Sequence, residues 1–277
     1  MKIPPGSLLA LVFSFTACAA SFSSHAALIG YYAFEEGSGT ATEDDSIGTD
    51  ADGILKNGAT FGAPSPAPGS TFSAEFDGTN DFIDLGNPTK YQNLTGAMTL
   101  SAWVYVDSYT ASGRIVTKGG NGTNRGWSLN IEFNGGGAPE ASFQIATSAS
   151  VLATVETLPL NPMPTGTWYH LAGVFTPDSV ADANSDGTLA IYVNGVLANS
   201  KTTSAGSQHN STANVAIGAR SDGTVPFDGR IDDVRIYDQA LSAADIAALA
   251  VPEPGAGALL FLALGTLALR RSRRDAH

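Results

Sequence analysis

The sequence has little cysteine, little histidine and few basic residues. Cys18 is the only cysteine among 277 residues, and it lies in a segment that we expect to be removed, so no disulfide can stabilise the rest of the chain. Residues 27–250 contain two histidines, His170 and His209, which argues against a histidine-rich zinc cluster. The same region has nine basic and 24 acidic residues, a net charge of about −15. Such a surface disfavours binding to nucleic acid or anionic lipid.

Helical periodicity is also nearly absent. Short runs rich in Val, Ile, Phe, Tyr and Thr alternate with clusters of Gly, Asn, Asp, Ser and Pro, a pattern typical of antiparallel sheets. One short helix is expected at Ser242–Leu249, because Ser242 can cap its N-terminus. Asn194-Gly195 predicts a two-residue hairpin turn, since a type I′ turn needs positive φ at both positions. We expect strands near Leu28–Phe34, Phe72–Phe76, Phe82–Leu85, Met98–Val106, Arg114–Lys118, Trp127–Phe133, Ser142–Thr147, Thr167–Phe175, Thr188–Val193, Asn214–Gly218 and Arg230–Tyr237.

The N-terminus is typical of a secretory signal peptide, which we assign to residues 1–26. Lys2 supplies a positive charge, Leu8–Phe15 an apolar run, and Ser24-His25-Ala26 a cleavage site of small residues. The alternative is a lipoprotein signal, because Phe15-Thr16-Ala17-Cys18 loosely resembles a lipobox. The N-terminal pattern therefore predicts export from the cytoplasm.

Residues 251–277 carry three elements in a fixed order. They are Pro252-Glu253-Pro254, an apolar run from Gly255 to Leu269, and a basic group of Arg270, Arg271, Arg273 and Arg274. As a helix, this run would cover about 22 Å at ~1.5 Å per residue, less than the ~30 Å hydrocarbon core of a bilayer. The arginines are expected to stay on the cytoplasmic side, which leaves everything upstream outside.

This order resembles the C-terminal sorting signal of PEP-CTERM proteins. The resemblance implies recognition by exosortase-type sorting machinery and transient anchoring of the C-terminal helix in the inner membrane. It also implies delivery to the cell envelope, surface or extracellular matrix of a Gram-negative bacterium that makes extracellular polysaccharide. The alternative is an ordinary C-terminal anchor helix.

Seven sequence blocks follow one another along the single domain expected at residues 27–250. They are Tyr32–Gly39, Asp45–Gly48, Phe76–Gly78, Leu100–Val104, Trp168–Leu171, Ile191–Gly195 and Phe227–Tyr237. Their order resembles that of laminin-G-like jelly rolls of the concanavalin A type. The resemblance implies an all-β fold, an antiparallel jelly-roll sandwich of two curved sheets, which is used mostly to bind carbohydrate or protein.

Three aspartates are candidate metal ligands. Alternation along the last strand puts Asp232 on the same face as Val234, so Asp232 would be a buried carboxylate in need of a cation or several hydrogen bonds. Asp45 and Asp52 lie in a segment that resembles the metal loop of the family, with Thr49 where Asn is common. We therefore expect a structural Ca²⁺ bound by these three aspartates. The alternative is that the first two stabilise turns and the third accepts backbone N–H groups.

Two further patterns are compared with known functional motifs: a loop and a catalytic triplet. Asp182–Gly187 resembles the first half of an EF-hand loop, but the twelfth position is Val193 rather than Glu, so a polar loop is favoured and weak Ca²⁺ binding stays open. Glucanases of the concanavalin type carry Glu-x-Asp-x-(x)-Glu on one strand, and this triplet is missing from the sequence. Catalysis therefore finds little support.

Glycan binding is the functional hypothesis that the polar loops favour. Sugar sites combine aromatic faces with polar groups that bind hydroxyls, and the candidates for such groups are Trp127, Arg125, Asn124 and Tyr109. Trp127 follows a glycine at the start of an expected strand, so a core position is its alternative role. We expect an exported, non-catalytic protein that binds glycan or exopolysaccharide through a calcium-stabilised jelly roll. The alternatives are a structural or protein-binding envelope component without a sugar site and, third, a glycosidase.

Overall fold

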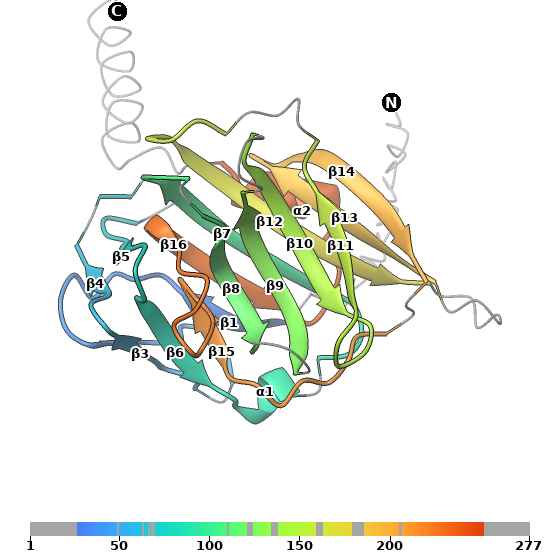
Figure 1. Cartoon of the computed structure of the whole chain (residues 1–277), viewed down its shortest axis with the longest axis horizontal. Helices are drawn as coiled ribbons and strands as arrows, with labels where there is room; N and C mark the ends of the chain where they lie inside the picture. The colour runs from blue at the N-terminus through green and yellow to red at the C-terminus, as the bar shows by residue number, and fades with distance from the viewer. Residues whose placement is uncertain are drawn as a thin grey trace, which may run out of the picture.

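Two antiparallel sheets packed face to face make up the fold in the computed structural model of the chain (Figure 1). The expected all-β jelly-roll sandwich is therefore confirmed. The predicted signal peptide (1–26) and most of the predicted sorting signal (252–277) lie outside the described residues. Within the part of the chain that is described, no helix is long and apolar enough to cross a membrane. The structure describes residues 27–251 except 49, 63, 66, 68–69, 93, 110, 121–123, 134–137, 159–162, 179–185 and 205–206.

The first sheet runs in the order β14-β13-β12-β7-β16-β5-β4, with β1 also paired to β16. Strand β16 changes its neighbour midway, because residues 228–231 pair with β5 and residues 234–237 pair with β1. Between these two segments the register of β16 against β7 shifts, and Asp233 has a φ of 52°. The strands are β1 (Leu28–Tyr32), β4 (Thr60–Phe61), β5 (Ala74–Asp77), β7 (Met98–Val106), β12 (Trp168–Pro177), β13 (Gly187–Val193), β14 (Val196–Thr203) and β16 (Asp228–Tyr237).

The second sheet runs in the order β11-β10-β9-β8-β15-β6-β3-β2. Its strands are β2 (Ala41–Thr42), β3 (Gly53–Lys56), β6 (Phe82–Gly86), β8 (Gly113–Gly119), β9 (Arg125–Glu132), β10 (Glu140–Ala146), β11 (Leu152–Glu156) and β15 (Val215–Ile217). Two short helices complete the described elements, α1 (Thr89–Gln92) and α2 (Ala243–Leu249). In Figure 1, strands β8 to β11 lie side by side in front of the first sheet.

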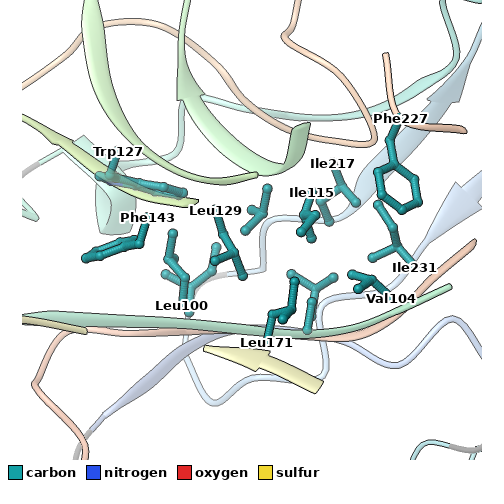
Figure 2. Packing of buried hydrophobic residues seen from close by; sticks show 14 of the residues in the cluster. Leu100, Val104, Ile115, Trp127, Leu129, Phe143, Leu171, Ile217, Phe227 and Ile231 are labelled. Carbon is teal, nitrogen blue, oxygen red and sulfur yellow. The ribbon is translucent and has the colours of Figure 1, made fainter. Parts of the chain in front are cut away.

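The core fills the space between the two sheets (Figure 2). Because side chains alternate along a strand, each sheet turns every second residue inward. Leu100 on β7 and Leu171 on β12 thus face Leu129 on β9 and Phe143 on β10. Gly173 on β12 is needed at this layer, because a Cβ atom there would lie 2.3 Å from the ring of Phe143.

The local signals for the hairpin and the helix are confirmed. Asn194 and Gly195 have φ angles of 50° and 78°, as a type I′ turn between β13 and β14 requires. Ser242 caps α2 in a capping box with Asp245. Helix α2 packs the buried side chain of Ile246 on the outer face of the first sheet, against β12.

Candidate functional site

A cleft of about 360 Å³ lies on the outer face of strands β8 to β11. Its walls come from these four strands, from the turn between β8 and β9, and from Arg220 in the segment between β15 and β16. The lining residues are Arg114, Thr117, Lys118, Gly119, Gly120, Arg125, Gly126, Trp127, Ser128, Glu132, Gln144, Leu152, Glu156 and Arg220.

Alternation along β9 and β10 makes this face polar. Leu129 and Ile131 point into the core, so Ser128, Asn130 and Glu132 point away from it. On β10, Gln144 lies opposite Ser128 in the register. Sequence reasoning missed this polar face, although the pattern Ser-x-Asn-x-Glu on a predicted strand was a signal for it.

Two polar side chains under the cleft have unsatisfied hydrogen-bonding groups. Asn130 and Ser142 lie opposite each other on β9 and β10, and both are 0% exposed. Neither amide atom of Asn130 nor the hydroxyl of Ser142 has a hydrogen-bond partner among the described residues. Leaving such a group unsatisfied costs about 1–3 kcal/mol, and native structures avoid it unless the group has a role. Both side chains lie on outward-facing positions of their strands, but neither lines the cleft, which is bordered there by Ser128, Glu132 and Gln144.

Glu132 on β9 contacts lining residues on both neighbouring strands, β8 and β10. Its Oε1 accepts a hydrogen bond from Nη1 of Arg114 at 2.7 Å and one from Nε2 of Gln144 at 3.3 Å. Burial raises the pKa of Glu156 on the neighbouring strand β11, and the nearby carboxylates of Glu140 and Glu132 raise it further. This end of the cleft therefore presents carboxylate oxygens, which can accept hydrogen bonds from hydroxyls.

Four basic residues also line the cleft: Arg114, Lys118, Arg125 and Arg220. Burial lowers the pKa of Arg220, and the like charges of Arg114 and Arg125 act in the same direction. Lys118 is 2% exposed, and burial lowers its pKa to about 8. Its Nζ donates to Oδ1 of Asn87 at 2.5 Å and to a backbone carbonyl at 2.9 Å. The charges of Asp222 and Glu132 act on the pKa of Arg220 in the opposite direction to those of Arg114 and Arg125.

The four predicted ligand-binding residues have different environments. Arg125 lines the cleft, but Trp127 is 2% exposed, packs edge-on against Tyr91 and points into the core beside Phe143 (Figure 2). The alternation of β9 turns this ring inward, so it offers no face to a sugar. Asn124 is engaged with Ser211 and Thr212 of a neighbouring loop. The hydroxyl of Tyr109 donates to the backbone carbonyl of Met163, away from the cleft lining.

The structure does not bring the three predicted calcium ligands together. In the described part of the chain, no group of three or more His, Cys, Asp and Glu residues could hold a metal ion. Asp45 is exposed; burial raises its pKa, and the neighbouring carboxylates, among them Asp52, raise it further. These residues therefore do not fit a shared calcium site with Asp232, and calcium itself stays a prediction.

The neighbouring Asp44, rather than Asp45, has its carboxylate buried. Its Oδ2 contacts Nζ of Lys90, and its Oδ1 accepts from the backbone N–H groups of Tyr31 and Ser46. Burial by itself raises the pKa of Asp44, but the hydrogen bonds from Lys90 and Ser46 outweigh burial and lower it below its ordinary value. A lysine thus supplies the positive charge in this loop.

Asp232 is 0% exposed, as predicted for a buried carboxylate, but strand alternation does not place it on the face of Val234. The register shift leaves both Asp232 and Asp233 between the core residues Ile231 and Val234. Oγ of Ser65 and the backbone N–H of Asp233 donate to the Asp232 carboxylate. Burial nevertheless raises the pKa of Asp232 to about 7. The partners of this carboxylate are thus a hydroxyl and an N–H group. This is close to the alternative given in the sequence analysis, in which Asp232 accepts backbone N–H groups.

Comparison with protein families agrees with the fold. A laminin-G family model, described as concanavalin A-like lectin/glucanases superfamily, matches residues 77–247, more than half of the chain. A search of curated proteins found no match to the sequence.

Solved structures of low sequence identity share the fold. Domain 4 of AbnA, a GH43 extracellular arabinanase from Geobacillus stearothermophilus solved with arabinotriose, has a TM-score of 0.59 at 20% identity, covering 82% of this chain and 99% of that one. The binding domain of Paraclostridial Mosquitocidal Protein 1 has a TM-score of 0.59 at 16% identity, covering 81% of this chain and 52% of that one. The receptor binding domain of botulinum neurotoxin C/D mosaic serotype has a TM-score of 0.56 at 14% identity, covering 81% of this chain and 51% of that one. This chain therefore spans about half of each toxin structure.

Proposed function

Because the chain belongs to the concanavalin A-like lectin/glucanases superfamily, we propose that it is an exported, non-catalytic protein that binds a carbohydrate chain in the cleft on β8 to β11. The observation that carries this proposal is that Ser128 and Gln144, opposite each other on β9 and β10, place a hydroxyl and an amide in the lining of the cleft. A sugar presents hydroxyls that both donate and accept, so it can satisfy an amide and a hydroxyl together.

The walls of the cleft support the same ligand class. Thr117 adds a neutral polar group to the lining, and Glu132 adds a carboxylate held in position by Arg114. Carbohydrate recognition depends on such fixed, planar hydrogen-bonding groups. The similar domain of the arabinanase was solved with a bound trisaccharide, which agrees with this assignment.

The delivery of the protein is proposed from its ends. The N-terminal pattern of residues 1–26 supports export, and the order of Pro252-Glu253-Pro254, apolar run and arginines supports sorting by an exosortase-type system. Removal of residues 251–277 is expected to change processing and delivery to the envelope or matrix. Unchanged delivery of the shortened protein in cell fractionation would contradict the sorting part of the proposal.

A second candidate function is binding to a protein partner without a sugar site. The observation in its favour is that two of the similar structures are a binding domain and a receptor binding domain of toxins. A glycosidase is the third candidate, and Glu132 and Glu156 are its carboxylates in the cleft. Release of reducing ends from a bound polysaccharide would contradict the non-catalytic assignment.

A blocked cleft tests the proposed function directly. Gln144→Trp places a large ring in the cleft wall, and Ser200→Trp places the same ring on the exposed edge strand β14. Binding of the purified full chain to a panel of neutral and acidic polysaccharides is measured by affinity electrophoresis. We expect Gln144→Trp to abolish retention and Ser200→Trp to keep it. Equal retention of both variants on every polymer would overturn the cleft as the binding site.

A further inference from the structure

The edge of the first sheet carries an uncharged hairpin beside the C-terminal end of the described chain. Residues 187–200, which form β13, the turn and the start of β14, contain no charged side chain, although residues 27–250 have a net charge of about −15. Residues 239–251 contain one charge, Asp245, which is held in the capping box at the first turn of α2. Both segments thus lack the acidic residues that the rest of the domain carries.

The hairpin turn touches the last turn of α2. A Cβ atom added at Gly195 would lie 2.9 Å from Cα of Ala247 and 3.1 Å from Cβ of Ala250. Leu197 pairs with Tyr192, whose side chain packs against the cluster that α2 forms with β12. Because directly opposite residues on neighbouring strands share a face, Leu197 lies on the side of the sheet that α2 covers. The hairpin tip and the end of the helix therefore form one surface.

This surface exposes large apolar side chains. Val196 is 70% exposed, Leu197 50% and Val251 60%. Ala247 and Ala248 of α2 are exposed as well. These five residues make up what we call the hairpin patch. Burying one valine or leucine fully contributes about 1.5–3 kcal/mol, and apolar side chains that gather on a surface mark contact with a partner or a membrane.

The chain leaves the domain at the hairpin patch. Val251 is followed by Pro252-Glu253-Pro254 and then by the apolar run that begins at Gly255, which we expect to enter a membrane. Four residues span at most about 14 Å when fully extended. The polar headgroup layer on each side of a bilayer is itself about 5–8 Å thick. If the run enters the hydrocarbon core at Gly255, Val251 and the patch beside it must therefore lie close to the headgroups.

Charge decides which face of the domain can touch lipid. A carboxylate loses hydration when it enters the headgroup layer, which is unfavourable without a partner, whereas an exposed leucine or valine gains from the transfer. The hairpin patch has apolar side chains and no carboxylate among its five residues. A tethered contact also needs little affinity of its own, because the tether keeps its effective concentration high. A few apolar side chains are thus enough to orient the domain.

We infer that the hairpin patch rests on the lipid headgroups while the tail is anchored, so that the domain has one fixed orientation on the membrane. This inference rests on the proposed anchoring of the apolar run and adds a second contact to it. Val196 and Leu197 enter the interface, and Pro252-Glu253-Pro254 is held at the lipid surface, where the sorting machinery is expected to act.

The test measures how deeply the hairpin tip enters a bilayer. The full chain carries Cys18→Ser and one new cysteine with a nitrobenzoxadiazole dye, either Leu197→Cys or Ile54→Cys. Ile54 is similarly exposed, at 52%, but lies on β3 near the other end of the second sheet. Each protein is placed in phosphatidylcholine nanodiscs with or without lipid that carries a doxyl quencher near its headgroup. We expect at least about twofold more quenching at 197 than at 54, because interfacial apolar side chains reach ~5–10 Å into the bilayer.

A charge placed in the hairpin patch supplies the matched variant. Val196→Asp, with the dye at position 197, should lose at least about half of the quenching, because its carboxylate must give up water in the interface. Thr60→Asp adds the same charge at an exposed position on β4, outside the patch, and should leave the quenching at 197 unchanged. Circular dichroism of each variant checks that the fold is intact.

The outcomes separate this inference from the proposed delivery. Comigration with nanodiscs that depends on residues 251–277, together with equal quenching of the two dyes, would overturn the patch contact and leave the anchor standing. A dye at 197 that is shielded from iodide in the water, yet is not quenched by the doxyl lipid, would show that protein rather than lipid covers the patch. A full chain that fails to comigrate, or that comigrates equally well without residues 251–277, would overturn both proposals.

Discussion

The outer faces of the two sheets differ in what covers them and in where their basic side chains lie. On the first sheet, α2 covers Ala172 and Val174, and the guanidinium groups of Arg230 and Arg235 lie 4.7 Å from the ring centroids of Tyr105 and Tyr31. Both arginines also have carboxylate partners on that sheet. On the second sheet, the outer face of β8 to β11 is hollowed by the cleft, which four basic residues line.

Strand alternation alone does not explain this difference, because both sheets turn their polar residues outward. What differs is which element covers each face and where the carboxylates lie. The first face pairs its two arginines with carboxylates and tyrosine rings of the same sheet. The second face places four of the nine basic residues of 27–250 around a cleft, which is expected where a ligand binds.

The largest effect is expected where α2 covers the first sheet. Ile246 is 0% exposed, so Ile246→Ala should lower the free energy of unfolding by about 2–5 kcal/mol through lost burial and a residual cavity. Urea unfolding of the full chain measures this change. Ile54→Ala, at a 52% exposed position, is the control and should cost no more than about 0.5 kcal/mol. Equal losses at the two positions would contradict the covering role of α2.

The next effect concerns the buried carboxylate of Asp232. Its pKa is about 7 in the folded protein and 3.8 as an ordinary aspartate, so the folded state binds the proton more tightly. The free energy of unfolding should therefore fall as pH rises from about 4 to about 7. Asp232→Asn should remove this dependence and raise stability at pH 8 by about 2–4 kcal/mol.

Thermal unfolding between pH 4 and 8 measures this dependence, and Asp107→Asn at an exposed position serves as its control. An amide at position 232 can still accept from the N–H of Asp233 and donate to Ser65, so the geometry is preserved. If the variant is instead destabilised, and chelator destabilises only the parent, then the carboxylate binds calcium and our structural interpretation fails.

A pair of serines compares the two faces with one substitution. Ser142 on β10 and Ser101 on β7 are both 0% exposed, and neither hydroxyl has a partner among the described residues. Serine to alanine at either site should raise the free energy of unfolding by about 1 kcal/mol, because an unsatisfied group is removed. Neither substitution should weaken polysaccharide binding, measured by titration, because neither side chain lines the cleft. Loss of binding from either variant would contradict the assignment of the site to the lining residues.

The smallest effect is expected in the acidic loop before β3. Burial and the carboxylates of Glu36 and Glu43 raise the pKa of Asp45, so Asp45→Asn should relieve repulsion and stabilise by about 0.3 kcal/mol in chelator. Differential scanning calorimetry with and without calcium measures the stability of the parent protein and of the variant. Asp45→Asn should stay more stable than the parent when calcium is added. If calcium instead makes the parent more stable than the variant, this loop binds the ion.

Sequence reasoning predicted the sandwich because period-2 alternation and turn residues are local signals. The strands β7, β9, β12 and β16 fall close to their predicted positions. The strands missing from the predicted set are β2, β3, β4, β11 and β14. The first four have two to five residues and depend on pairing partners rather than on their own pattern. The eight residues of β14 are mostly polar, and only the predicted hairpin turn at Asn194-Gly195 implied a strand there.

The candidate site was harder to predict, because its residues meet only through strand register. Ser128 and Gln144 are neighbours across β9 and β10, and Arg220 comes from a distant segment. The bulge at Asp233 is another non-local feature: alternation assumed a regular strand, whereas β16 adjusts its register where it exchanges β5 for β1. No spacing in the sequence marks that exchange.

The position of β16 has a consequence for how the chain reaches its final state. Three strands from the earlier part of the sequence, β1, β5 and β7, find a partner in this single late segment. Because such distant pairings are slow to form, the first sheet cannot close until synthesis has passed Tyr237. Until then the nascent polypeptide remains without a completed first layer, and truncation before Asp228 deprives three strands of their neighbour at once.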